Sequence, residues 1–167
     1  SSGTGTAVHL TGELFKSVAH VDITHVPYKG GGPALSDLIA GQIPMGVQNI
    51  TTIVPYVRGG RIRALGISSL ERSPALPDVP TVASQGFPGF EAREWYGLVA
   101  PAGTPRAIVA QLNQEIVRII NHPEIRSRLL DLGADIVGDS PDQFGAFIKA
   151  ELVKWSKLLK ETGIRLE

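Results

Sequence analysis

The chain has 167 residues, of which 43% are hydrophobic and 19% are charged, as in ordinary soluble globular domains. Its 16 basic and 16 acidic residues balance, which argues against a nucleic-acid partner, because phosphate binding normally requires a basic surface. Cysteine is absent, which excludes disulfides, thiol nucleophiles and thiolate metal sites. No apolar run approaches the roughly 20 residues that a membrane-spanning helix needs.

The first 69 residues alternate between helical and strand-like patterns. Leu10, Leu14 and Val18 recur every four residues on one face of a helix, whereas residues 23–27 alternate like a short strand. The predicted order is helix, strand, helix, strand, helix, strand over residues 6–18, 23–27, 33–39, 45–47, 50–57 and 62–67. Because parallel strands are joined by helical crossovers, this order predicts an α/β fold with a mainly parallel sheet.

A proline-rich stretch separates this part from the rest. Residues 73–80 can continue neither a helix nor a central strand, so they are predicted to form an extended linker at a domain boundary. The elements predicted beyond it are a strand at 95–100, helices after Pro105 and Pro123, a short strand at 136–137, and a helix starting after Ser140.

The final predicted helix carries a continuous apolar stripe from Phe144 to Leu159 and is expected to be the longest. A glycine, Gly163, is expected to end it. The two tryptophans, Trp95 and Trp155, are expected to belong to the core.

The first candidate binding loop comprises Ser2, Gly3, Thr4, Gly5 and Thr6 and runs directly into a helix. Glycines allow backbone N–H groups to turn toward a ligand, and a helix start adds free donors and a positive dipole end. Hydroxyl groups on alternate residues supply further donors. Such a loop suits a carboxylate or phosphate, although it lacks the Lys-Ser/Thr pair of a Walker loop. The alternative is an ordinary helix N-cap with flexible glycines.

Two further loops also join a predicted strand to a predicted helix. They contain Tyr28, Lys29, Gly30 and Gly31 in one case, and Gln48 and Asn49 in the other. The carboxyl ends of neighbouring parallel strands share one rim, where open α/β sheets bind ligands. All three loops are therefore predicted to converge on one concave site. The alternatives are a solvated amine for Lys29, a half-buried ring for Tyr28 and a helix cap for Asn49.

The sequence offers no catalytic or metal-binding constellation. Histidines stand at positions 9, 20, 25 and 122, without the spacing of a helical ligand pair or an accompanying carboxylate cluster. No serine lies in a Gly-x-Ser-x-Gly elbow. His9 is expected to pack or hydrogen bond near the first loop rather than to act as a base. We therefore expect no catalysis, no metal and no cofactor.

Taken in order, the motifs resemble those of the tripartite tricarboxylate transporter receptors, also called Bug receptors. The resemblance covers essentially the whole chain. It rests on Ser-Gly-x-Gly-Thr at 2–6, His-Leu at 9–10, His-Val-Pro-Tyr-Lys-Gly at 25–30, Gly-Pro-Ala at 32–34, Arg-Ala-Leu at 63–65, the stretch 72–81, Trp-Tyr-Gly-Leu at 95–98 and 100–105.

The resemblance implies a type II-like periplasmic-binding-protein fold with two α/β domains, in which residues 1–69 are most of the second domain. Residues 70–167 would then be the linker and the C-terminal portion of the first domain. It also implies a periplasmic receptor that captures a small carboxylate, such as a dicarboxylate, amino acid or aromatic acid, for a transporter's membrane components. Many members carry an acidic residue where Gln48 stands, so a ligand amine is less expected here.

Two other functions stay open on the residues. In the first, the chain is an α/β enzyme domain whose glycine-rich loops bind an acyl or phosphoryl anion. In the second, the chain has a purely structural or oligomerising role. The resemblance to the family leads us to expect a further segment before Ser1 in a full-length member. Unpaired strand edges favour association, so a homodimer with weak ligand binding is expected if this chain is the whole molecule.

Overall fold

A computed structural model describes residues 1–162, with the side chains of residues 1–160. The described chain forms two compact units, Ser1–Glu94 and a second unit that begins at Trp95. The domain boundary predicted after residue 69 concerns a longer receptor and stays a prediction. Within the described residues, no helix combines the length and the apolar character needed to cross a membrane.

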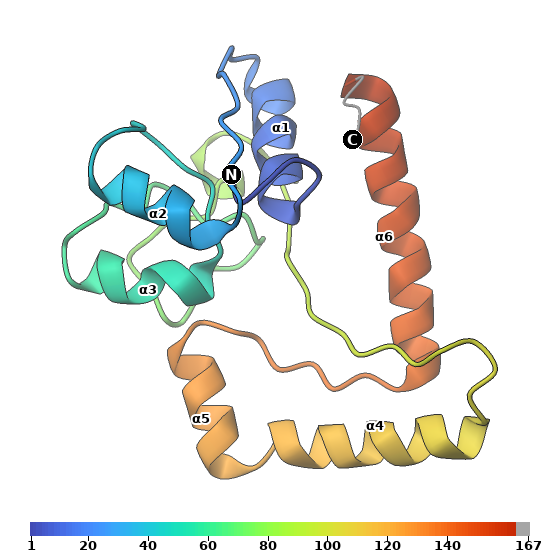
Figure 1. The fold of residues 1–167 in the computed structure, drawn as a ribbon. Helices are drawn as coiled ribbons and strands as arrows, with labels where there is room; N and C mark the ends of the chain where they lie inside the picture. The colour runs from blue at the N-terminus through green and yellow to red at the C-terminus, as the bar shows by residue number, and fades with distance from the viewer. Residues whose placement is uncertain (163–167) are drawn as a thin grey trace. The chain divides into compact units, whose positions relative to one another are not determined.

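The first unit contains three α-helices, α1 (Ala7–Ala19), α2 (Gly31–Ile39) and α3 (Ile50–Arg58), and the short 3₁₀ turn η1 (Ala83–Gln85) (Figure 1). The three predicted helices are confirmed, with α2 starting two residues earlier than its proline suggested. Local chemistry explains the ends of α1. Thr6 caps its start, and His20 ends it in the left-handed conformation with its N–H bonded to Lys16 O.

A small hydrophobic core lies between α3 and the proline-rich stretch. Val54 packs with Ala75, Leu76 and Val79, all of which are buried. The Arg58 Nη2 group also donates a hydrogen bond to Ala75 O at 3.0 Å. Residues 73–80, predicted as an extended linker, therefore form part of the core of the first unit, because their apolar side chains fold back onto α3.

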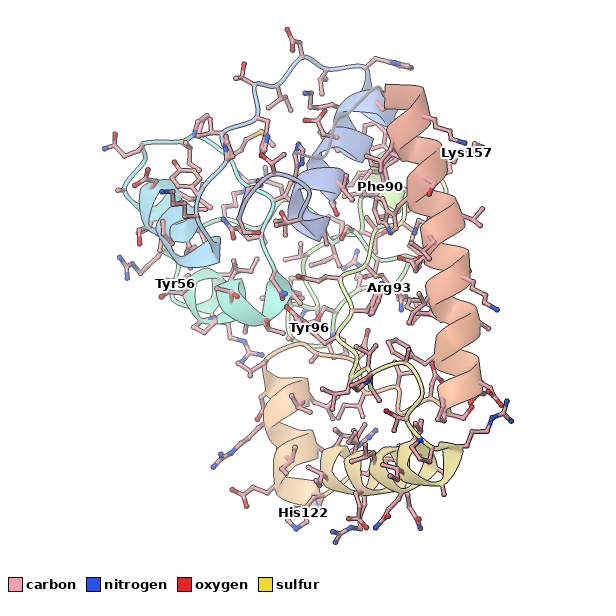
Figure 2. The ribbon with its side chains drawn as sticks, turned by 45° about the vertical axis from the view of Figure 1, so that its right-hand side comes forward. Tyr56, Phe90, Arg93, Tyr96, His122 and Lys157 are labelled. Atoms are coloured by element: carbon pink, nitrogen blue, oxygen red, sulfur yellow. The ribbon has the colours of Figure 1, made fainter. Side chains whose placement is uncertain are left out.

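Aromatic side chains form a second contact in this unit. Phe15 of α1 meets Phe87 and Phe90 edge-on, with ring centroids 5.6 Å and 6.3 Å away. Phe90 is 4% exposed and is labelled in Figure 2. The segment after η1 thus packs against the C-terminal half of α1. The first candidate loop precedes the N-terminus of the same helix.

The predicted strands are extended segments with few strand-to-strand hydrogen bonds. A parallel bridge joins Ile67 to Thr81, through Ile67 N donating to Pro80 O at 2.9 Å and Val82 N donating to Ile67 O at 2.8 Å. Ser1 makes the same alternation, donating to Val26 O at 2.9 Å and accepting from Tyr28 N at 3.1 Å. Both pairings are parallel in sense, and the mainly parallel sheet stays a prediction.

The second unit contains α4 (Arg106–Ile120), α5 (Pro123–Asp131) and α6 (Pro141–Thr162). Helices α4 and α5 meet at a corner beside His122 (Figure 2). With 22 residues, α6 is the longest helix of the described chain, as predicted. It starts in a capping box in which Ser140 Oγ accepts from Gln143 N and Gln143 Oε1 accepts from Ser140 N. The predicted stop at Gly163 lies outside the described residues.

The prediction that both tryptophans are core residues is wrong for Trp95, which is 40% exposed. Its ring packs edge-on against Phe144 and Phe147 of α6, with both centroid distances at 5.5 Å. Trp155 is half-buried and donates its Nε1–H to Glu151 one turn earlier on the same helix. Trp95 lies in an extended segment, so the rings of α6 cover only part of its surface.

Candidate ligand-binding site

The structure brings the two glycine-rich loops together. Gly30 N donates to Ser2 O at 2.9 Å, and Tyr28 N donates to Ser1 O at 3.1 Å. The approach is close enough that a Cβ built on Gly3 would lie 3.3 Å from Tyr28 O. The chain start therefore lies beside the segment that leads into α2 (Figure 1). Loops 2–6 and 28–32 therefore lie side by side, as the sequence predicted for loops that precede helices at one rim of a sheet.

The hydroxyl groups of the first loop hold its shape. Thr6 Oγ1 donates to Gly3 O at 2.8 Å and accepts from His9 N at 3.4 Å, and Ser2 Oγ donates to Thr6 Oγ1 at 3.3 Å. Thr4 is the exposed residue of the loop. The first residues of an α-helix have no internal acceptor for their N–H groups. The N–H groups of Ala7 and Val8 are therefore the natural donors at this end of α1.

The start of α2, unlike that of α1, has no side-chain cap. Its N-cap is Gly30, which makes no side-chain cap, and Gly31 and Gly32 follow as the first helical residues. Gly30 has φ 116°, a conformation that side chains disfavour. A Cβ at Gly30, Gly31 or Gly32 would meet nothing within 4 Å. The helix start therefore offers open space, uncapped N–H groups and a positive dipole end to an anion.

Tyr28 and Lys29 lie between the two helix starts in sequence. Tyr28 Oη donates to Asp37 Oδ2 of α2 at 2.8 Å, which fixes the ring against that helix. Lys29 is exposed. The hydrogen bond to Asp37, with smaller effects of burial and of the Asp37 charge, raises the pKa of Tyr28 above its ordinary value.

Replacing the acceptor is expected to reverse that shift. In Asp37→Ala, the pKa of Tyr28 should fall toward its ordinary value, because the variant removes both the hydrogen-bond acceptor and the negative charge. An ultraviolet absorbance titration measures this, and Tyr28→Phe identifies which of the three tyrosine transitions belongs to Tyr28. Because the folded pKa is raised, this bond stabilises the fold below the unfolded tyrosine pKa and is lost as pH rises through the folded pKa. An unchanged titration in Asp37→Ala would contradict the contact.

The third predicted loop is built differently. Asn49 Oδ1 accepts from Thr51 N at 3.0 Å and so caps α3, while its Nδ2 donates to Glu94. Gln48 Nε2 is buried and has no hydrogen-bond acceptor among the described residues. The preceding Val47 lies against α1, because a Cβ on Gly12 would be 3.7 Å from Val47 Cγ2. The helix cap named as the alternative for Asn49 is observed, and a ligand contact by Gln48 or Asn49 stays a prediction.

Two histidines lie beneath the first loop. His9 is 6% exposed, and its Nδ1 accepts from Gly5 N at 3.0 Å. The His9 ring stacks on His25, with centroids 3.9 Å apart and planes 16° apart. His25 Nε2 lies 2.6 Å from Ser1 Oγ, which in turn accepts from Gly3 N at 3.2 Å. The expectation that His9 packs and hydrogen bonds is confirmed, whereas the sequence reasoning missed its pairing with His25.

Burial lowers the pKa of His9 below its usual value, and burial together with the neighbouring His9 lowers the pKa of His25. Glu13 partly opposes this effect on His9, since its Oε1 lies 3.9 Å from His9 Nε2. Lys16 Nζ lies 3.0 Å from Glu13 Oε2, and its positive charge also lowers the pKa of His9. Both rings are therefore neutral near pH 7. Within residues 1–162, no group of three His, Asp or Glu side chains lies close enough to hold a metal ion.

Comparison with known proteins shows the class of protein to which the chain belongs. The solved structures that match the chain include a periplasmic binding protein and a periplasmic transporter. Residues 1–164 also match the model of the tripartite tricarboxylate transporter family receptors. The chain belongs to this family.

Individual relatives match nearly the whole chain. An uncharacterised-family protein in the tcbD-tcbE intergenic region of Pseudomonas sp. strain P51 is 43% identical, over 96% of this chain and 48% of that protein. The structure of periplasmic binding protein BugD is 32% identical with a TM-score of 0.88, over 96% of this chain and 55% of that one.

Two of the matched structures contain a ligand. R. palustris Rpa4515 with adipate is 37% identical with a TM-score of 0.89, over 96% of this chain and 54% of that one. MatC from Rhodopseudomonas palustris with bound malate is 37% identical with a TM-score of 0.82, over 93% of this chain and 54% of that one. The chain thus spans about half the length of these four relatives.

Proposed function

We propose that this chain forms part of the ligand site of an extracytoplasmic receptor that captures a small carboxylate for a tripartite tricarboxylate transporter. The observation that carries the proposal is the pairing of two glycine-rich helix starts. Gly30 N binds Ser2 O, and Ser2 Oγ binds the N-cap Thr6, so the N-caps of α1 and α2 are linked through one residue.

This arrangement suits a carboxylate. The first-turn N–H groups of each helix point along the helix axis away from the chain, where they lack internal acceptors. A carboxylate oxygen accepts two or more such hydrogen bonds, which are stronger than those of a neutral acceptor. The aligned peptide dipoles add a partial positive charge at each start. The site therefore needs no arginine, and Lys29 at the exposed edge adds attraction at longer range.

Two relatives support a particular class of ligand. Adipate and malate, bound in two structures 37% identical to this chain, are both dicarboxylates. We therefore propose a dicarboxylate as the ligand, with one carboxylate at the paired helix starts. Gln48 is neutral, so a ligand ammonium group gains no ion pair from that position. The family implies a periplasmic location and docking onto the transporter's membrane components.

A ligand panel tests the proposal. Malate and adipate should raise the melting temperature of the protein, whereas a sugar phosphate and an uncharged sugar should leave it unchanged. At a concentration 100 times the Kd, binding adds about 2.7 kcal/mol, which corresponds to a rise of roughly 5–10 °C at this size. Isothermal calorimetry then gives the Kd for each acid.

The other outcomes decide between classes of protein. A shift with the sugar phosphate alone would overturn the carboxylate assignment and favour a phosphoryl site. Consumption of a bound acid over time, followed by chromatography, would indicate an enzyme instead of a receptor. No shift with any member of the panel would contradict the proposed function for this chain and favour a structural role.

A further inference from the structure

The stacked histidines hold both glycines of the first loop. His9 Nδ1 accepts the N–H of Gly5 at 3.0 Å, and His25 reaches Gly3 through Ser1 Oγ, with distances of 2.6 Å and 3.2 Å. Gly5 has φ 77° and Gly3 has φ 145°, so both depart from the extended or helical conformations of ordinary residues. The loop shape thus depends on contacts outside the loop itself.

The contact of His9 requires one protonation state. A ring nitrogen accepts a hydrogen bond only when it carries no proton, so His9 Nδ1 is bare and the proton of the neutral ring sits on Nε2. That Nε2 faces Glu13 Oε1 at 3.9 Å. Protonation of Nδ1 would replace an attractive contact with two N–H groups pointing at each other.

We infer that His9 is a positioning residue for ligand binding: its bare Nδ1 holds the N–H of Gly5, and this sets the loop Ser2–Thr6 in its ligand-binding shape. The inference rests on the proposed function of the loop. It adds a consequence that the proposed function does not require. Ligand affinity should fall when His9 takes up a proton, because the loop then loses the contact that shapes it.

The surroundings oppose that protonation near pH 7. The groups that face His9 are Glu13 and Lys16 from α1, His25 from the segment before α2, and the Ser1 amino group. Burial is the largest influence, and it lowers the pKa of His9 despite the opposing carboxylate of Glu13. Because the folded pKa is lowered, the contribution of His9 to stability is present above about pH 6.5 and is lost as pH falls through the folded pKa.

Two substitutions separate the acceptor from the imidazole ring. His9→Asn places an amide oxygen near the position of Nδ1, which keeps an acceptor that does not titrate. His9→Leu fills similar space without an acceptor and leaves Gly5 N–H unpaired. We expect His9→Leu to weaken malate or adipate binding about tenfold at pH 7.5, the usual effect of an unpaired buried donor, and His9→Asn to restore most of it.

The pH profile is measured by calorimetry between about pH 5 and pH 8, the range in which histidines titrate. Wild-type affinity should fall on the acid side more steeply than that of His9→Asn, whose profile reports the titration of the dicarboxylate itself. Identical profiles for the two proteins would overturn the inference. Equal binding by His9→Leu and wild type at pH 7.5 would do so as well.

A second measurement needs no ligand. Hydrogen exchange of the Gly5 amide, followed by NMR, should show protection in the wild type that disappears at acid pH and persists in His9→Asn. If no dicarboxylate binds at any pH, the proposed function fails, and the Gly5 amide alone decides the inference. An amide that is unprotected in the wild type, or equally protected in His9→Leu, would show that His9 does not position the loop.

Discussion

Gly97→Ala is expected to lower the free energy of unfolding of the second unit by about 3 kcal/mol, at the upper end of overpacking costs. A Cβ on Gly97 would lie 2.0 Å from Cζ of Phe144 and 2.6 Å from its Cε1. The ring cannot easily swing aside, because Trp95 and Phe147 pack against it. The added methyl group therefore forces either the extended segment or α6 to move.

Urea unfolding followed by tryptophan fluorescence measures this effect, since the chain's two tryptophans, Trp95 and Trp155, both belong to the second unit. Gly145→Ala is the matched control. Gly145 lies inside α6, and a Cβ there meets nothing within 4 Å, so this change should stabilise the helix by roughly 0.5–1 kcal/mol. Equal unfolding midpoints for the two variants would refute the packing described for Gly97.

Gly31→Asp is expected to weaken dicarboxylate binding by about 10- to 100-fold, or roughly 1–3 kcal/mol, because it places a like charge where the ligand carboxylate is proposed to bind. Gly31 suits the test because its Cβ would meet nothing within 4 Å and its φ is not positive. The neighbouring Gly30, at φ 116°, would combine backbone strain with charge.

The control for this second prediction is Gly31→Asn, which has nearly the same shape without the charge. It should bind malate within a fewfold of the wild type. An aspartate at the first position of α2 should also leave stability unchanged or slightly higher, because a negative charge favours a helix start. Weaker binding in a protein of undiminished stability would then be an effect on the site. Equal affinities for the two variants would place the ligand away from α2.

Patterns confined to a few neighbouring residues predicted the helices well. The spacing of Leu10, Leu14 and Val18 predicted α1, and Ser140 with Pro141 marked the start of the longest helix. These features succeed because helix hydrogen bonds and caps join residues three or four apart. The glycine-rich loops were also visible, since the chain order placed each one before a helix.

Contacts between distant residues depended on the tertiary structure. His9 and His25 are 16 positions apart, and neither is part of a recognisable pair until the chain folds and stacks their rings. The hydrogen bond from Tyr28 to Asp37 was equally unforeseen. The sequence therefore identified the glycine-rich loops, whereas the tertiary structure decided which side chains hold them.

Burial was the other quantity that composition could not decide. The sequence by itself determined that residues 73–80 would break helices and strands, because proline fixes φ and lacks an N–H. Only the tertiary structure decided that Ala75 and Leu76 would pack on Val54, and that Trp95 would stay 40% exposed. Backbone preferences are local properties of each residue, but burial depends on which distant surfaces the completed fold brings against it.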